Sequence, residues 1–386
     1  MSFLCGRCGT SLPATPGSRI FLTRGFAWTT GSKHDPFERD AIVQFYPQYR
    51  TVSRRYASTS PQPKQQPTPL ARRKSSTTTS LSADVNPPAS TRPDQLDLPA
   101  AVDPTASLKD KFSRYIALGK AYLTFYKNGL KNVYHNYRAS IPLRRSLGLP
   151  VYLPSSPPPR ATAAGEKPFQ TVVDSLNLSR ANFQLVRRAA YDVRRTIPFA
   201  LVLLICAELT PLAVLALGDA VTPYTCRVPQ QIDKTRLKRA QLKRDALAAI
   251  QASLGLSTSI KPGSEQELTW LAENFASPEF VNTASAEQVL LGCAMFGLTK
   301  RIDRPAFLVP WVYRPRLRRW AEYLALDDRL IVRGGGVDAL TPEEVRIAVD
   351  ERGGIGVGVG GGHARDAVEQ ERKWLAQWLQ KRNVVA

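Results

Sequence analysis

The chain has 386 residues, which is enough for two or three domains of ordinary size. Its 53 Lys and Arg against 32 Asp and Glu give a formal charge of +21, which excludes an acidic solvating protein and favours an anionic partner such as nucleic acid, a ribosome or an anionic membrane face. Five scattered cysteines are too few for a disulfide scaffold, and three widely separated histidines predict no metal site. We expect no cofactor.

The first segment has the composition of a mitochondrial transit peptide. Residues 1–34 contain no Asp or Glu and carry Arg and Lys among Ser, Thr and Gly. The run Arg54-Arg55-Tyr56-Ala57 resembles a mitochondrial processing site, so we predict a transit peptide over residues 1–56. The alternative is an ordinary disordered basic start.

An aromatic and basic helix is predicted between two linkers. Residues 57–107 are rich in Pro, Ser, Thr and Gln, which predicts disorder, and residues 148–180 form a second Pro-rich linker. Between them, residues 108–147 carry aromatic side chains at spacings of three, four and seven, interleaved with Lys and Arg, as in an amphipathic helix. Its aromatic stripe suits either a membrane interface or packing on another element of the protein.

The stretch from Ile197 to Leu217 predicts a transmembrane helix. Its 21 residues contain one charge, Glu208, and a helix of that length reaches about 30 Å, the thickness of the bilayer hydrocarbon. The apolar residues outweigh one central acid on insertion scales. The alternative is a buried core helix.

Glu208 and Pro211 form a candidate ion or proton site within this stretch. Pro211 has no N–H, so the carbonyl of Ala207 loses its helical partner next to the Glu208 carboxyl group. An acid inside a membrane is a functional-site hypothesis by default. The alternative is a protonated, purely structural glutamic acid, and transport through one helix per chain would require oligomers or partner helices.

The C-terminal half is predicted to be helical. Helices are expected over residues 233–254 with Asp233 as N-cap, and over 265–275, 285–298, 315–331 and 364–381. Thr341-Pro342-Glu343-Glu344 has the form of a capping box, and Trp374 and Trp378 fall on one face of the last helix. The glycines of residues 353–362 match G-x-G-x-x-G without a βαβ unit, which indicates a loop, and no catalytic motif is present, so we expect no enzyme.

Two basic clusters are candidates for binding ribosomal RNA or lipid, because cations contact phosphates and aromatic rings stack on bases. The first cluster has an anionic-lipid patch as its alternative, and the second a solvated surface. The first consists of Lys234, Arg236, Lys238, Arg239, Lys243 and Arg244. The second consists of Arg314, Arg316, Arg318 and Arg319, with Lys300, Arg301 and Arg304 before them and Trp311, Tyr313 and Trp320 interleaved.

Several of these features, in this order, resemble the leucine-zipper/EF-hand-containing transmembrane (Letm) family of the mitochondrial inner membrane. They cover about residues 108–381. The stretch around Glu208 resembles the family's membrane segment, and the Tyr115…Gly119-Lys120…Lys127 stretch resembles the helix that precedes it. The ribosome-binding domain of the family is matched by Arg316-Leu-Arg-Arg-Trp, Asp327-Asp328, Gly336-Val337, Glu344 and the closing Trp374-Leu…Trp378-Leu.

The resemblance implies a single-pass inner-membrane protein with a helical, 14-3-3-like ribosome-binding domain over residues 219–386 in the matrix. The expected partners are the mitochondrial ribosome, anionic lipid and a possible second copy. The expected role is membrane protein biogenesis and ion homeostasis, and the alternative is an oligomeric cation/proton antiporter, exchanging K+ or Ca2+ for protons through Glu208. No EF-hand loop or sustained heptad repeat is present, so this resembles a short member of the family.

Overall fold

The computed structural model describes residues 82–100, 107–159, 168–206, 221–255, 260–358 and 364–384. Their regular secondary structure is helical and these ranges contain no strand, so the all-α prediction is confirmed for them. The predicted transit peptide lies outside the described residues, as do residues 207–217 of the predicted span. No helix in the described ranges combines the length and the apolar character needed to cross a membrane.

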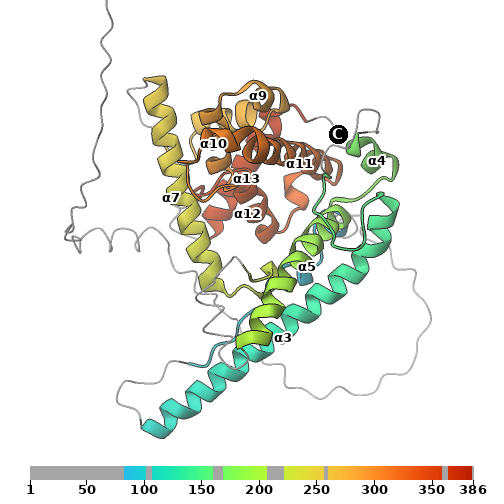
Figure 1. The fold of residues 1–386 in the computed structure, drawn as a ribbon, viewed down its shortest axis with the longest axis vertical. Helices are drawn as coiled ribbons and strands as arrows, with labels where there is room; N and C mark the ends of the chain where they lie inside the picture. Colours follow the sequence, from blue (N-terminus) through green and yellow to red (C-terminus); the bar gives the residue numbers. More distant parts are fainter. Residues whose placement is uncertain are drawn as a thin grey trace, which may run out of the picture. The chain divides into compact units, whose positions relative to one another are not determined.

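Figure 1 shows the helices coloured in their order along the chain. The longer ones are α3 (Leu108–Ser146), α5 (Arg180–Cys206), α7 (Pro229–Leu254), α11 (Arg314–Arg333) and α13 (Ala364–Lys381). The shorter α-helices are α4 (Phe169–Ser175), α8 (Glu265–Thr269), α9 (Pro278–Thr283), α10 (Ala286–Met295) and α12 (Pro342–Glu351). Single π or 3-10 turns are η1 (Ala89–Thr91), η4 (Tyr224–Cys226), η5 (Trp270–Phe275), η6 (Ala306–Leu308), η7 (Val309–Tyr313) and η8 (Val337–Ala339).

The predicted N-terminal caps of α7 and α12 differ from the structure. Helix α7 begins at Pro229 with Val228 as N-cap, so Asp233 is not the cap, because proline suits the first helical position, where no N–H is needed. At α12 the Thr341 side chain accepts from the Glu344 N–H, as a capping box requires. The Glu344 carboxylate, however, turns inward, and the Thr341 N–H donates to Asn86 instead. Only half of the predicted box is therefore present.

Helices from distant parts of the sequence share one core. Phe183 of α5, Leu324 of α11 and Val345 of α12 are fully buried in the same cluster as the two tryptophans of α13. Trp374 and Trp378 stack at 5.7 Å between ring centroids, so the prediction that they share a face is confirmed. The core of the C-terminal half therefore includes α5, which lies before the predicted domain boundary at residue 219.

The prediction of disorder is wrong for residues 82–100. Val85 is fully buried in the core, and the Asn86 amide donates to the Ala339 carbonyl at 2.8 Å. Val173 of α4, in the second predicted linker, is fully buried too. These segments are too polar to form a core of their own, but they order by docking on a core that other helices build.

Charged side chains without exposed surface link three of these helices. Arg180 of α5 donates to Asp327 of α11 at 2.9 Å, and all of both side chains is buried. Arg352, directly after α12, contacts Asp327 at 2.9 Å and Asp328 at 2.6 Å. Burial alone would raise the pKa of Asp327, but Arg180 and Arg352 outweigh it and hold that pKa well below its usual range.

The two flanks of the predicted span contact each other. The Asp192 carboxylate of α5 accepts from the Tyr224 N–H at 2.6 Å. Gly129 of α3 lies so close to η4 that a Cβ there would meet the Cys226 sulfur at 2.7 Å. A bilayer about 30 Å thick cannot separate groups at hydrogen-bond distance. The described flanks of residues 197–217 are therefore in contact with each other, which a helix crossing the bilayer between them would not by itself lead one to expect.

We predict that Arg180→Met lowers the free energy of unfolding by about 3–5 kcal/mol, because it leaves the Asp327 carboxylate buried with fewer partners. Urea unfolding of the full chain measures this change. Arg318→Met is the matched control, since Arg318 and Glu322 are about two-fifths exposed and 3.7 Å apart. That change should cost about 0–1 kcal/mol. Equal urea midpoints for Arg180→Met and Arg318→Met would contradict this prediction.

A second prediction concerns Asp192, whose burial raises the pKa from 3.8 to about 6. A folded-state pKa above the unfolded one means that the folded protein binds the proton more tightly. Stability from this group is therefore present at low pH and is lost as the pH rises from about 4 to about 6. Relative to Asp192→Asn, the wild type should lose up to about 3 kcal/mol over that window, at about 1.4 kcal/mol per pKa unit. If the free energies of unfolding of the wild type and Asp192→Asn differ by the same amount at every pH, the prediction is refuted.

Candidate nucleic-acid interface

The two predicted basic clusters meet at the turn that follows α10. Arg239 of α7 donates to the Phe296 carbonyl at 3.3 Å, and Arg316 of α11 donates to the Leu298 carbonyl at 2.9 Å. Helix α7 runs beside α10 (Figure 1), which positions its middle against this turn. Residues about 75 positions apart in sequence are thereby brought to one place.

The first cluster divides between the two faces of α7. Arg236, Arg239 and Lys243, at spacings of three and four, point into the domain. Arg236 pairs with Asp350 at 3.0 Å, and Lys243 is buried against Glu267 at 2.7 Å. Burial lowers the pKa of Lys243. The exposed members are Lys234, Lys238 and Arg244.

The second cluster also contains arginines with structural roles. Arg314 donates to the carbonyls of Val281, Asn282 and Ala284 at 2.6–2.7 Å and so closes the end of α9. Arg318 faces Glu322 one turn along α11. Arg319 is half-buried, and only Arg316 is classed as exposed. The predicted binding residues of this cluster are therefore mostly occupied within the domain.

The segment before α11 has exposed aromatic and basic side chains. The exposed fractions of Phe307 and Trp311 are 71% and 83%, the highest of any aromatic residues in the C-terminal half that the structure describes. Lys300 and Arg301 are exposed at the beginning of the same segment. We call residues 300–312 the basic-aromatic loop. Asp303 is exposed in it as well, so the loop is not uniformly basic.

The other aromatic residues predicted for this site serve the fold. Tyr313 is buried, and the Trp320 indole donates to the Glu351 carbonyl at 3.2 Å. The sequence analysis did not identify Phe307. Residues 306–313 form the helical turns η6 and η7, and no local pattern separates exposed Phe307 from buried Val309 there.

The basic-aromatic loop has the chemistry of a single-strand nucleic-acid contact. An exposed indole and an exposed phenyl ring offer flat surfaces for bases, and the neighbouring cations offer phosphate contacts. Arg316 adds a guanidinium at the base of the loop, 5.8 Å from the centre of the Tyr313 ring. Lys234, Lys238 and Arg244 are exposed on α7, together with Asp233 and Asp245.

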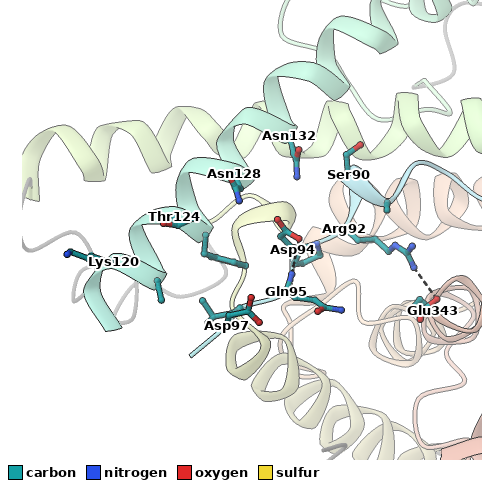
Figure 2. A pocket seen from close by; sticks show the side chains of 15 residues that line it. Ser90, Arg92, Asp94, Gln95, Asp97, Lys120, Thr124, Asn128, Asn132 and Glu343 are labelled. Atoms are coloured by element: carbon teal, nitrogen blue, oxygen red, sulfur yellow. Dashed lines mark hydrogen bonds and ion pairs between the residues drawn. The ribbon is translucent and has the colours of Figure 1, made fainter. Parts of the chain in front are cut away.

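A polar cleft of about 1040 Å³ lies elsewhere, between residues 89–97 and α3. Figure 2 shows Lys120, Thr124, Asn128 and Asn132 along α3 and the segment with Asp94 and Asp97 beside them. Arg92 and Glu343 pair across one end at 3.5 Å. Both signs of charge line this cleft, so its electrostatics select no class of ligand.

The remaining predicted site residues, Glu208 and Pro211, lie outside the described ranges. Burial raises the pKa of the Cys226 and Cys293 thiols to about 12, which keeps both protonated. Within the ranges described, no three His, Cys, Asp or Glu side chains are arranged to hold a metal. The turns over Gly353–Gly358 bear out the loop prediction for that part of the glycine-rich segment.

No family model, no curated protein and no solved structure matches this chain. The resemblance to the Letm family therefore remains a prediction from the quoted motifs.

Proposed function

We propose that this protein binds RNA of the mitochondrial ribosome through the basic-aromatic loop and the outer face of α7. The observation that carries the proposal is the pair of exposed aromatic rings, Phe307 and Trp311, next to exposed Lys300 and Arg301. Exposed aromatic rings can stack on unpaired bases while neighbouring cations contact phosphates.

The location we propose is the matrix face of the mitochondrial inner membrane. The transit-peptide composition of residues 1–34 and the apolar stretch at 197–217 support it, together with the Letm resemblance. Because residues 180–192 pack with the C-terminal helices, the domain on both sides of that stretch belongs to the same compartment. A ribosome docked there would deliver its products close to the membrane.

Antiport of cations through Glu208 remains the alternative function. It depends on residues outside the described ranges, and nothing described favours it. Binding of the ribosome and transport are separable experimentally, because they use different parts of the chain.

We predict that replacing both Phe307 and Trp311 with Ala weakens co-sedimentation with mitochondrial ribosomes by about tenfold or more. Stacking on one aromatic side chain contributes about 1–3 kcal/mol per base, and tenfold corresponds to about 1.4 kcal/mol. Tyr152→Ala is the matched control, because Tyr152 is 88% exposed on a distant loop. Loss of binding in the control, or none in the double variant, would contradict the proposal.

A further prediction concerns how the affinity for the ribosome depends on salt concentration. Each phosphate contact removed should reduce the slope of log affinity against log salt by about 1. Lys300→Gln with Arg301→Gln should therefore lower that slope by up to about 2. Lys373→Gln is the control, since Lys373 is exposed on α13 and pairs only with Glu369 among described contacts. Unchanged slopes in all variants would exclude a phosphate-binding role for the loop. Arg316 is a poorer choice for this test, because it also holds the Leu298 carbonyl.

A further inference from the structure

The first half of α3 leaves an apolar face uncovered by the rest of the described chain. The exposed fraction of Leu108 is 85%, that of Phe112 67%, that of Tyr115 72% and that of Leu123 70%. Together with Ile116, which is 46% exposed, they recur at helical spacing and share one face. Helix α3 also packs against α5 and η4, and Tyr134 on the same face in its second half is 54% exposed.

Positive charge flanks this face. Lys109, Lys120 and Lys127 are exposed and lie along one edge of the apolar stripe, because they are about one helical position away from its members. An amphipathic helix with an aromatic-rich apolar face and lysines at its edge is the form that binds an anionic bilayer surface. Long lysine side chains reach the headgroups while the apolar face enters the acyl boundary.

The end of α5 also has exposed apolar side chains. Tyr126 of α3 lies 6.1 Å from Phe199 of α5 between ring centroids, so the two helices are side by side there (Figure 1). Beyond this contact the α5 side chains are exposed, at 54% for Leu201, 78% for Leu204 and 79% for Ile205. Two neighbouring helices thus present apolar side chains at the same end of the α3–α5 pair.

We propose that this surface, which we call the α3–α5 foot, binds an anionic lipid bilayer from the same side as the rest of the described domain. The foot consists of Leu108, Phe112, Tyr115, Ile116 and Leu123 of α3 and Leu201, Leu204 and Ile205 of α5. The contact between Asp192 and Tyr224 keeps both flanks of the apolar stretch on that side. The domain therefore contacts the bilayer from one side, and no separately folded part of the described chain lies on the other side.

Anionic lipid is the occupant that the charges favour. A second copy of the chain would bring the same lysines together at the edges of a shared apolar face, where like charges repel. A bilayer with anionic headgroups neutralises them instead. Attraction to such a surface grows with each Lys or Arg that lies near it.

Vesicle flotation of the full chain tests the proposal. We expect the protein to float with phosphatidylcholine vesicles that contain phosphatidylglycerol and to float less with pure phosphatidylcholine. The variant with Phe112→Ser and Tyr115→Ser should bind the anionic vesicles about tenfold more weakly or worse, since each aromatic ring loses its burial in lipid. Lys109→Gln with Lys120→Gln should reduce the preference for anionic vesicles.

The controls use exposed residues of the same kinds away from the foot. Tyr152→Ser and Lys373→Gln should float like the wild type. Co-sedimentation with ribosomes should survive the Phe112 and Tyr115 changes, and far-ultraviolet circular dichroism should show that α3 remains helical. Loss of RNA binding by loop variants would not affect flotation, so this inference and the proposed function fail independently.

Two results would overturn the proposal. One is flotation of the Phe112→Ser, Tyr115→Ser variant equal to that of the wild type, which would leave lipid binding to other residues. The other is a wild type that ignores anionic lipid and forms a dimer in solution that the same two changes abolish. That result would identify a second copy of the chain as the occupant.

Discussion

Four charged side chains with no exposed surface hold the described domain together. Arg180 comes from the start of α5, Asp327 and Asp328 from the middle of α11, and Arg352 from the end of α12. The Trp378 indole donates to Asp328 at 3.1 Å and adds α13 to the network. Each charge has a partner of opposite sign, so removing any one leaves another buried with fewer partners. The network thereby fixes which helices belong together, and α5 belongs with the C-terminal ones.

The same use of arginine explains why so few of the many cations are available to a partner. Arg239 and Arg314 donate to backbone carbonyls, and Lys243 is buried against Glu267. Exposed cations include those on the outer face of α7, in the basic-aromatic loop and along α3. Net charge thus overstates the binding surface, because part of it neutralises carboxylates and caps helices inside the domain. The two exposed regions proposed to bind RNA and lipid lie on separate helices.

Local patterns in the sequence predicted most helices, including α13 with its bounds and α3 to within one residue. They failed for segments whose structure depends on contacts with distant parts of the chain. Residues 82–100 look disordered because their own composition is polar, yet Val85 is buried by helices more than 200 residues away. The charge runs identified both basic clusters. They did not separate inward from outward members, although Arg236, Arg239 and Lys243 already show helical spacing. The Arg180–Asp327 pair joins residues 147 positions apart, and no local pattern indicates it.

The central claim is that the segments before and after residues 197–217 fold as one unit on one side of the membrane. Cysteines introduced separately at Tyr152 and Lys373, both exposed, test it through a membrane-impermeant maleimide applied to mitoplasts, with the wild type as background. Tyr152 precedes the apolar stretch and Lys373 follows it. The account predicts that both cysteines are protected until detergent is added. Labelling of Tyr152→Cys in intact mitoplasts, with Lys373→Cys protected, would contradict it.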